Sequence, residues 1–189
     1  MRLFPRVVSE AEAPYGAPTN KVRVLPPEVA HRIAAGEVIE RPASAVKELV
    51  ENALDAGATR VKVEIEGGGT RLLRVRDDGS GMSAEDAERA VAHHATSKIE
   101  TAEDLAMVVS LGFRGEALHA VSSVSSLTLT TSQPGAPYGT CVRVIAGGPA
   151  RASSASHPPG TTVEARDLFL NLPVRRGFLG TERAEARTH

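Results

Sequence analysis

The chain has 189 residues, 41% of them hydrophobic and 24% charged, which is the composition of a folded globular protein with a buried core. Its 22 basic and 23 acidic residues give a net charge of −1, so overall charge does not indicate nucleic-acid or membrane binding. The single cysteine, Cys141, excludes an internal disulfide and a cysteine-rich metal site, and no apolar run is long enough to span a membrane. We expect Cys141 to be a buried, inert thiol in a strand.

Residues 1–20 lack apolar periodicity and predict a flexible leader, followed by one domain over 21–189. A short helix is expected after Pro27. The next helix is the best defined: Pro42 suits its first turn and Gly57 its left-handed end. Its apolar face is predicted to contain Ala45, Val46, Leu49, Val50, Ala53 and Leu54.

Glu48, Asn52 and Asp55 share the polar face of this helix. A carboxylate and a carboxamide one turn apart can orient a water molecule and ligate a hard cation such as Mg²⁺. Taken alone, however, the pattern is more typical of the solvated side of a surface helix. The residues that follow favour the first interpretation.

Alternation predicts strands over 60–66 and 70–76, joined by a turn at 67–69. Ser83 with Asp86, and Thr101 with Asp104, are capping boxes for helices that reach about 94 and 109. A further helix is expected from Glu116, then strands over 126–131, 140–145 and 161–165, with a loose segment over 146–160. This order predicts an α+β fold, a two-layer sandwich of helices on a mixed, mainly antiparallel sheet.

Two glycine-containing loops suggest nucleotide chemistry, although the chain has neither a P-loop nor a strand–GxGxxG–helix unit. In the first, Asp77-x-Gly79-x-Gly81, a fixed carboxylate can accept a hydrogen bond from an amine such as that of adenine, and the glycines allow a ligand to approach. By itself this motif is also ordinary turn chemistry. The second, Gly112 to Glu116, opens a helix, where backbone N–H groups suit a phosphate. Thr96-Ser97-Lys98 adds hydroxyl groups and a lysine.

In this order the motifs resemble the N-terminal ATPase region of the MutL family of DNA mismatch-repair proteins. That family belongs to the wider class of gyrase, heat-shock chaperone and histidine kinase ATPases, which share the Bergerat-type ATP-binding fold. The match runs from about Val24 to Leu179. It is carried by LPPEVAHRIAAGEVIERPASAVKELVENALDAGA, DDGSGM, HATSKI, LGFRGEAL, PPGTTVEARDLF and NLPVRR.

The resemblance implies a role for each matched residue. Glu48 is expected to be the general base and Asn52 the Mg²⁺ ligand. Asp77 is expected to read the adenine amino group, with Thr162 beside it. The remaining expected ATP contacts are Gly79, Gly81, Met82, Thr96, Ser97, Lys98, Gly112, Phe113, Arg114, Gly115, Glu116, Ala117 and Leu118, of which 96–98 and 112–118 form a lid.

For the protein as a whole, the resemblance implies a Mg²⁺-dependent ATPase whose lid closes on ATP and whose N-terminal domains then form a homodimer. The implied partners are a mismatch-recognition protein and a downstream nuclease or helicase, in a bacterial, nucleoid-associated, cytoplasmic setting. The lid is expected to be poorly ordered without nucleotide. Arg175 and Arg176 allow a DNA contact, but solvated basic residues are the preferred interpretation.

The sequence also departs from the family pattern. The family's second domain, which supplies a lysine to the γ-phosphate, and its dimerisation domain lie beyond His189, so this fragment is expected to hydrolyse ATP slowly. Asp78 stands where asparagine is usual and puts the selectivity for adenine in question, and Leu172 stands where threonine is usual. The alternative function is a nucleotide-gated binding module with negligible turnover. A sensor-kinase domain fits less well because GFRGEAL is not expected there.

Overall fold

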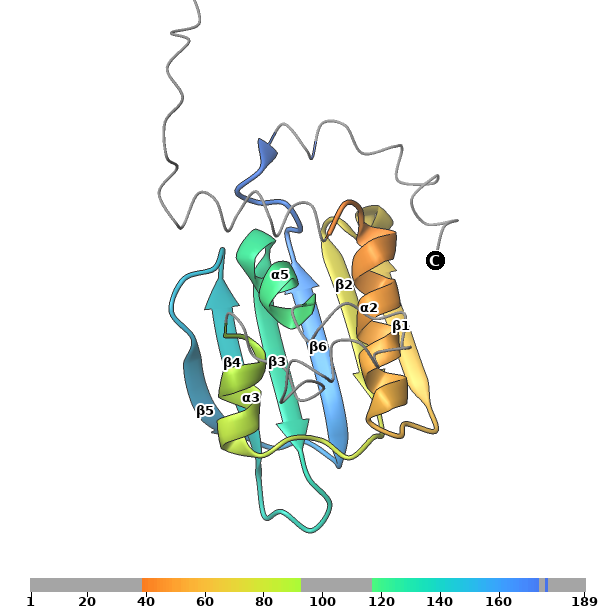
Figure 1. Cartoon of the computed structure of the whole chain (residues 1–189), viewed down its shortest axis with the longest axis vertical. Helices are drawn as coiled ribbons and strands as arrows, with labels where there is room; N and C mark the ends of the chain where they lie inside the picture. Colours follow the sequence, from red (N-terminus) through yellow and green to blue (C-terminus); the bar gives the residue numbers. More distant parts are fainter. Residues whose placement is uncertain (1–38, 93–116, 174–175, 177–189) are drawn as a thin grey trace, which may run out of the picture.

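A computed structural model describes residues 39–92, 117–173 and 176. In this part of the chain, three α-helices lie on one face of a six-stranded sheet (Figure 1). The helices are α2 (Pro42–Asp55), α3 (Ala84–Ala90) and α5 (Ala117–Val124). The strands are β1 (Val61–Glu66), β2 (Leu72–Asp77), β3 (Ser126–Ser132), β4 (Gly139–Ile145), β5 (Arg151–Ala155) and β6 (Gly160–Arg166).

The strand order in the sheet is β1-β2-β6-β3-β4-β5. Each pair of neighbours is antiparallel, so the predicted two-layer sandwich is confirmed, whereas the expected mixture of strand directions is not found among the described strands. The last strand, β6, lies between β2 and β3 (Figure 1). This placement brings the start of β6 beside the end of β2, where Thr162 pairs with Arg76.

The core lies between the sheet and the helices. Because side chains alternate along a strand, one face of the sheet is apolar, and residues in register across four strands cover it. Removing a valine or leucine side chain from water stabilises the fold by about 1.5–3 kcal/mol, and an alanine side chain contributes less. The apolar face consists of Leu73 and Val75, Val163 and Ala165, Leu127 and Leu129, and Val142 and Val144.

The opposite face of the sheet is polar and held by ion pairs. The Arg74 guanidinium lies 2.5 Å from Glu64 on β1 and 2.5 Å from Glu164 on β6. Hydrogen bonds from Lys62 and Arg74 hold the pKa of Glu64 below its ordinary value. Among the described residues, the three helices lie on the apolar face, which gives the predicted two layers (Figure 1).

The central helix is confirmed in its bounds and in its ends. Pro42 occupies the first turn, Ala56 follows as the cap, and Gly57 has a φ of +72°. The apolar face is narrower than predicted, because the Leu54 side chain is 59% exposed. Leu54 belongs to the flank of the helix and not to its buried stripe.

Three other expectations can be compared with the described residues. Ser83 caps α3 as predicted, with its hydroxyl accepting from the Asp86 N–H at 3.1 Å, but the helix ends at Ala90. Cys141 is a buried, free cysteine in β4, as expected. Strand β5 was not predicted, because its sequence, RASSA, lacks apolar alternation and its first four residues are exposed.

The predicted leader (1–20), the helix after Pro27 and the helix from Thr101 fall on residues outside those described, as do residues 96–98 and 112–116 of the predicted lid. No helix in the described ranges is long and apolar enough to cross a bilayer.

Candidate functional site

The loop that follows β2 is fastened to the end of α2. The Ser80 N–H donates to the Ala56 carbonyl at 2.9 Å. A Cβ on Gly79 would lie only 2.8 Å from the same Ala56 oxygen, so a side chain there would push the loop away. Ala56 in turn donates to the Asn52 carbonyl at 3.0 Å. The loop carrying Asp77 therefore lies against the last turn of α2.

The far end of the same loop crosses the end of β3. Gly81 has a φ of +64°, and a Cβ there would lie 2.0 Å from the Ser132 carbonyl oxygen. The Met82 N–H donates to the Thr131 hydroxyl at 2.9 Å. Both glycines were predicted to leave room for a ligand, but the structure shows that protein backbone already requires glycine at each position.

The Asp77 carboxylate is oriented by two backbone donors. Its Oδ1 accepts hydrogen bonds from Gly79 N–H at 2.9 Å and from Thr161 N–H at 3.1 Å. The described residues donate no hydrogen bond to Oδ2. Burial raises the pKa of Asp77, whereas these two N–H groups lower it, and the neighbouring Asp78 raises it further. The carboxylate is thus half-buried, fixed at one oxygen and able to accept a donor at the other.

Asp78 is directed away from this carboxylate. Its two oxygens accept hydrogen bonds from the Thr59 N–H at 2.7 Å, the Thr59 hydroxyl at 2.8 Å and the Arg60 N–H at 2.8 Å. These bonds, that from Arg60 foremost, lower the pKa of Asp78. The residue that departs from the family pattern therefore holds the connection between α2 and β1.

Glu48 and Asn52 lie on one flank of α2. Figure 1 shows α2 in front of the sheet, with β1 on one side and α5 and α3 on the other. At 3.6 residues per turn, Glu48, Asn52 and Asp55 fall on one flank of the buried stripe of α2, and Val50 and Leu54 fall on the other. Glu48 and Asn52 are both half-buried. They therefore share a partly covered flank of α2, beside its buried stripe.

Glu51 differs from a solvated helix residue. Its Oε2 is buried and has no hydrogen-bond partner within the described ranges, and its Oε1 lies 3.7 Å from the Lys47 ammonium. A buried carboxylate oxygen without a donor costs free energy. The Glu51 side chain as a whole is 30% exposed, so one of its oxygens is covered while the rest meets solvent.

Thr161, not Thr162, lies beside Asp77. The Thr161 side chain is buried on the helix-covered face of β6, and its hydroxyl lies 3.0 Å from the Thr131 hydroxyl. Thr162, the next residue, points to the opposite face, where its hydroxyl lies 2.9 Å from Nε2 of His157. The predicted position of the Thr162 side chain is therefore corrected by the alternation of the strand.

Five of the predicted site residues lie close together near the end of α2, and others fall outside the residues that the structure describes. Ala117 is buried at the start of α5, and Leu118 packs against the core. Thr96 to Lys98 and Gly112 to Glu116 lie outside the described residues. The residues grouped around the loop are Asp77, Gly79, Gly81 and Met82, with Asn52 one turn from Ala56.

Sequence reasoning missed Thr131 and Gly160. The Thr131 hydroxyl donates to the Gly160 carbonyl at 3.1 Å as well as accepting from Met82. Thr131 is fully buried. The sequence did contain a sign of Thr131, because it stands at an inward position of an otherwise apolar strand. A buried hydroxyl requires hydrogen-bond partners.

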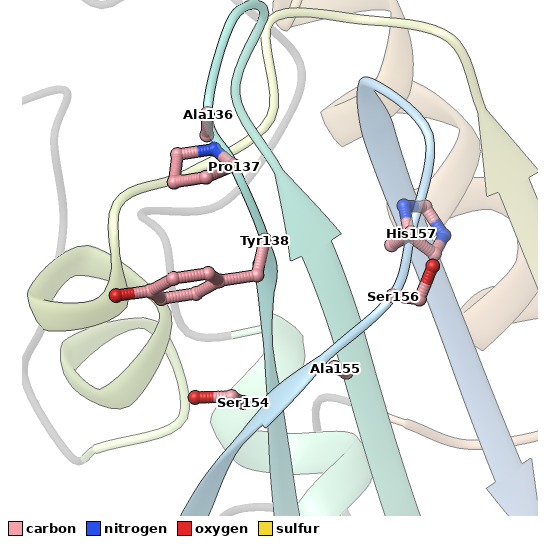
Figure 2. Close-up of a pocket in the computed structure, with 7 residues that line it drawn as sticks. All are labelled: Ala136, Pro137, Tyr138, Ser154, Ala155, Ser156 and His157. Atoms are coloured by element: carbon pink, nitrogen blue, oxygen red, sulfur yellow. The ribbon is translucent and has the colours of Figure 1, made fainter.

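A hollow of about 350 Å³ lies elsewhere, between the β3–β4 connection and the end of β5 (Figure 2). Tyr138 and His157 stand on its two sides. None of the predicted site residues lines it. Its lining is Ala136, Pro137, Tyr138, Ser154, Ala155, Ser156 and His157.

Comparison with known proteins identifies the class to which this fold and loop belong. The profile of the histidine kinase-, DNA gyrase B- and HSP90-like ATPases matches residues 39–144, more than half of the chain. The chain therefore belongs to this ATPase family.

Within that class the similarity is to MutL proteins, as the motifs predicted. The chain is 54% identical over 164 residues to the DNA mismatch repair protein MutL of Xanthomonas campestris pv. campestris (strain B100), covering 87% of this chain and 26% of that protein. It is 55% identical over 167 residues to MutL of Serratia proteamaculans (strain 568), with the same coverage. The chain thus spans about a quarter of the length of these relatives.

A solved structure agrees. The Aquifex aeolicus MutL ATPase domain complexed with ADP is 42% identical, with a TM-score of 0.60 over 80% of this chain and 52% of that one. The fold class and the resemblance to the MutL ATPase region are confirmed.

Proposed function

We propose that this chain is the ATP-binding and ATP-hydrolysing N-terminal domain of a MutL-type mismatch-repair protein. The observation that carries the proposal is the Asp77 carboxylate, fixed by Gly79 and Thr161 at one oxygen and able to accept at the other. Its loop is fastened to the end of the helix that bears Glu48 and Asn52. The relative crystallised with ADP supports a nucleotide as the ligand.

Asp77 recognises the base. A fixed carboxylate oxygen accepts a hydrogen bond from the exocyclic amine of adenine and repels the carbonyl that guanine carries at the equivalent position. Because Oδ1 is already engaged by two N–H groups, the side chain is oriented before the nucleotide arrives. The residue therefore gives selectivity with little entropic cost.

Glu48 and Asn52 act at the phosphate end. Glu48 accepts a proton from the water that attacks the γ-phosphate and orients that water. Asn52 offers a carboxamide oxygen to Mg²⁺, which when bound offsets phosphate charge. The described residues contain no cluster of three His, Cys, Asp or Glu side chains that could hold a metal. One protein oxygen fits Mg²⁺, which is usually held by one or two protein ligands, waters and phosphates.

The proposal includes closure of a lid, formation of a dimer and signalling to partner proteins. Residues 96–98 and 112–118 close over the phosphates, and the closed form associates with a second copy. Ordering a lid costs conformational entropy, which ligand contacts and the new interface offset. The nucleotide state then signals to a mismatch-recognition protein and to a nuclease or helicase.

Replacing Glu48 with Ala tests the catalytic role. Steady-state ATP hydrolysis is expected to fall by a factor of about 100 or more, because general-base catalysis contributes about that much, while ADP still binds. Lys47→Ala, one residue away on the exposed side of α2, is the matched control and should retain activity. If ADP binds but hydrolysis does not fall in the Glu48 variant, Glu48 is not the base, and the nucleotide-gated binding module becomes the better description.

A further inference from the structure

His157 forms a bridge across the connection between β5 and β6. Its Nδ1 lies 2.6 Å from the Pro158 carbonyl oxygen, and its Nε2 lies 2.9 Å from the Thr162 hydroxyl. A carbonyl only accepts, so Nδ1 carries the proton and, in the neutral ring, Nε2 accepts from the hydroxyl. Figure 2 shows the His157 ring where the chain leaves β5 for β6. Both ring nitrogens are therefore used to close one short turn.

The bridged turn is the one that rests on Asp77. Gly160, within it, has a φ of +118°, and a Cβ there would lie 2.3 Å from the Asp77 carbonyl oxygen. Thr161, the next residue, donates its N–H to Asp77 Oδ1 at 3.1 Å. The backbone that orients the carboxylate thus lies between the two anchor points of the His157 ring, Pro158 and Thr162.

The other donor to Asp77 does not depend on this turn. The Gly79 N–H comes from the loop fastened to Ala56 at the end of α2. Releasing the His157 bridge would therefore loosen one of the two hydrogen bonds and leave the other intact. The Gly79 amide can therefore serve as an internal control for the Thr161 amide in the same protein.

We propose that His157 is a positioning residue for adenine recognition, acting through Thr162 to hold the Thr161 N–H on the Asp77 carboxylate. The inference rests on the proposed function, since it names a residue that sets the base selectivity of the same site. It also gives Thr162 a role that differs from contact with the nucleotide: its hydroxyl closes the bridge from the opposite face of β6.

The first test needs no nucleotide. In ¹⁵N-labelled protein, His157→Ala is expected to shift the Thr161 amide resonance and to speed its hydrogen exchange by about 2- to 10-fold, the equivalent of one neutral hydrogen bond. The Gly79 amide should be unchanged. Thr162→Val should reproduce the effect, Thr162→Ser should not, and Ser156→Ala, on the same connection, is the control. Unchanged Thr161 exchange in both His157→Ala and Thr162→Val would overturn the proposal.

The second test measures selectivity. Inosine diphosphate carries a carbonyl where ADP carries the amino group, so the ratio of the two affinities reports the Asp77 contact. His157→Ala is expected to lower that ratio by about 3- to 10-fold, and the double variant with Thr162→Val should lower it no further. If the wild-type protein prefers ADP and His157→Ala leaves the ratio of the two affinities unaltered, the positioning role of His157 is refuted while the proposed function stands. Failure of the wild-type protein to bind ADP would refute the proposed function, and the amide test would still decide whether the bridge holds Thr161.

Discussion

Replacing Asp77 with Asn tests the role of Oδ2, because it changes that oxygen and keeps the other. The carboxamide oxygen can still accept from the Gly79 and Thr161 N–H groups, so the loop should keep its structure. The change places an NH₂ donor where Oδ2 stood, facing the donor of the adenine amine. Losing a hydrogen bond to a charged acceptor costs about 1.5–3 kcal/mol, which corresponds to about 10- to 150-fold in the dissociation constant.

Isothermal titration calorimetry of ADP and inosine diphosphate measures the effect. The Asp77→Asn variant should lose affinity for ADP by this factor and gain relative affinity for inosine diphosphate, whose carbonyl accepts from the new NH₂ group. Asp78→Asn is the matched control, because its amide can keep the bonds to Thr59 and Arg60. Equal losses for both nucleotides, or no loss for ADP, would refute the assignment of Asp77 to the base.

Three further outcomes are expected. Asn52→Ala should reduce the Mg²⁺ dependence of ATP binding, measured by titration with and without the metal; unchanged dependence would remove the metal role. Gly81→Ala should destabilise the fold by about 2–5 kcal/mol in urea denaturation, because the left-handed backbone and the contact with the Ser132 carbonyl both oppose a side chain; a loss below about 1 kcal/mol would contradict this. ADP affinity should fall on acidification at a pH above the ordinary carboxyl value of 3.8, since burial raises the pKa of Asp77 and protonation of its free oxygen would put an O–H donor opposite the adenine amine; affinity independent of pH down to that value would argue against the assignment. The same raised pKa means that ionised Asp77 lowers folding stability near neutral pH; this cost decreases as the pH falls through the folded-state pKa and is gone below the unfolded value of 3.8.

Much of the fold follows from local pattern. The helix over Pro42–Asp55 carries its own stop and start residues, and the alternating strands β2, β3, β4 and β6 carry one apolar face each, so their bounds were predicted to within a few residues. Strand β5 was missed because it is an edge strand held by backbone pairing with β4, which needs no apolar side chains. Its existence depends on a neighbour that local pattern does not reveal.

The candidate site was predicted less completely, because motif order does not fix side-chain direction. The GTT motif contains two consecutive threonines, and the sequence does not show which of them lies beside Asp77. The register of β6 against β2 decides that it is Thr161. The glycines of the Asp77 loop were assigned to a ligand, yet Ala56 and Ser132 already require them. Helical spacing placed Leu54 on the apolar face of α2, whereas its side chain is 59% exposed in the structure.

A crystal structure of this chain with Mg²⁺ and a non-hydrolysable ATP analogue is the most direct measurement. It should place the adenine amine within hydrogen-bond distance of Asp77 Oδ2, the metal on the Asn52 carboxamide oxygen, and a water between Glu48 and the γ-phosphate. Density for the base in the hollow beside Tyr138, or phosphates on the polar face of the sheet near Arg74, would contradict the site described here.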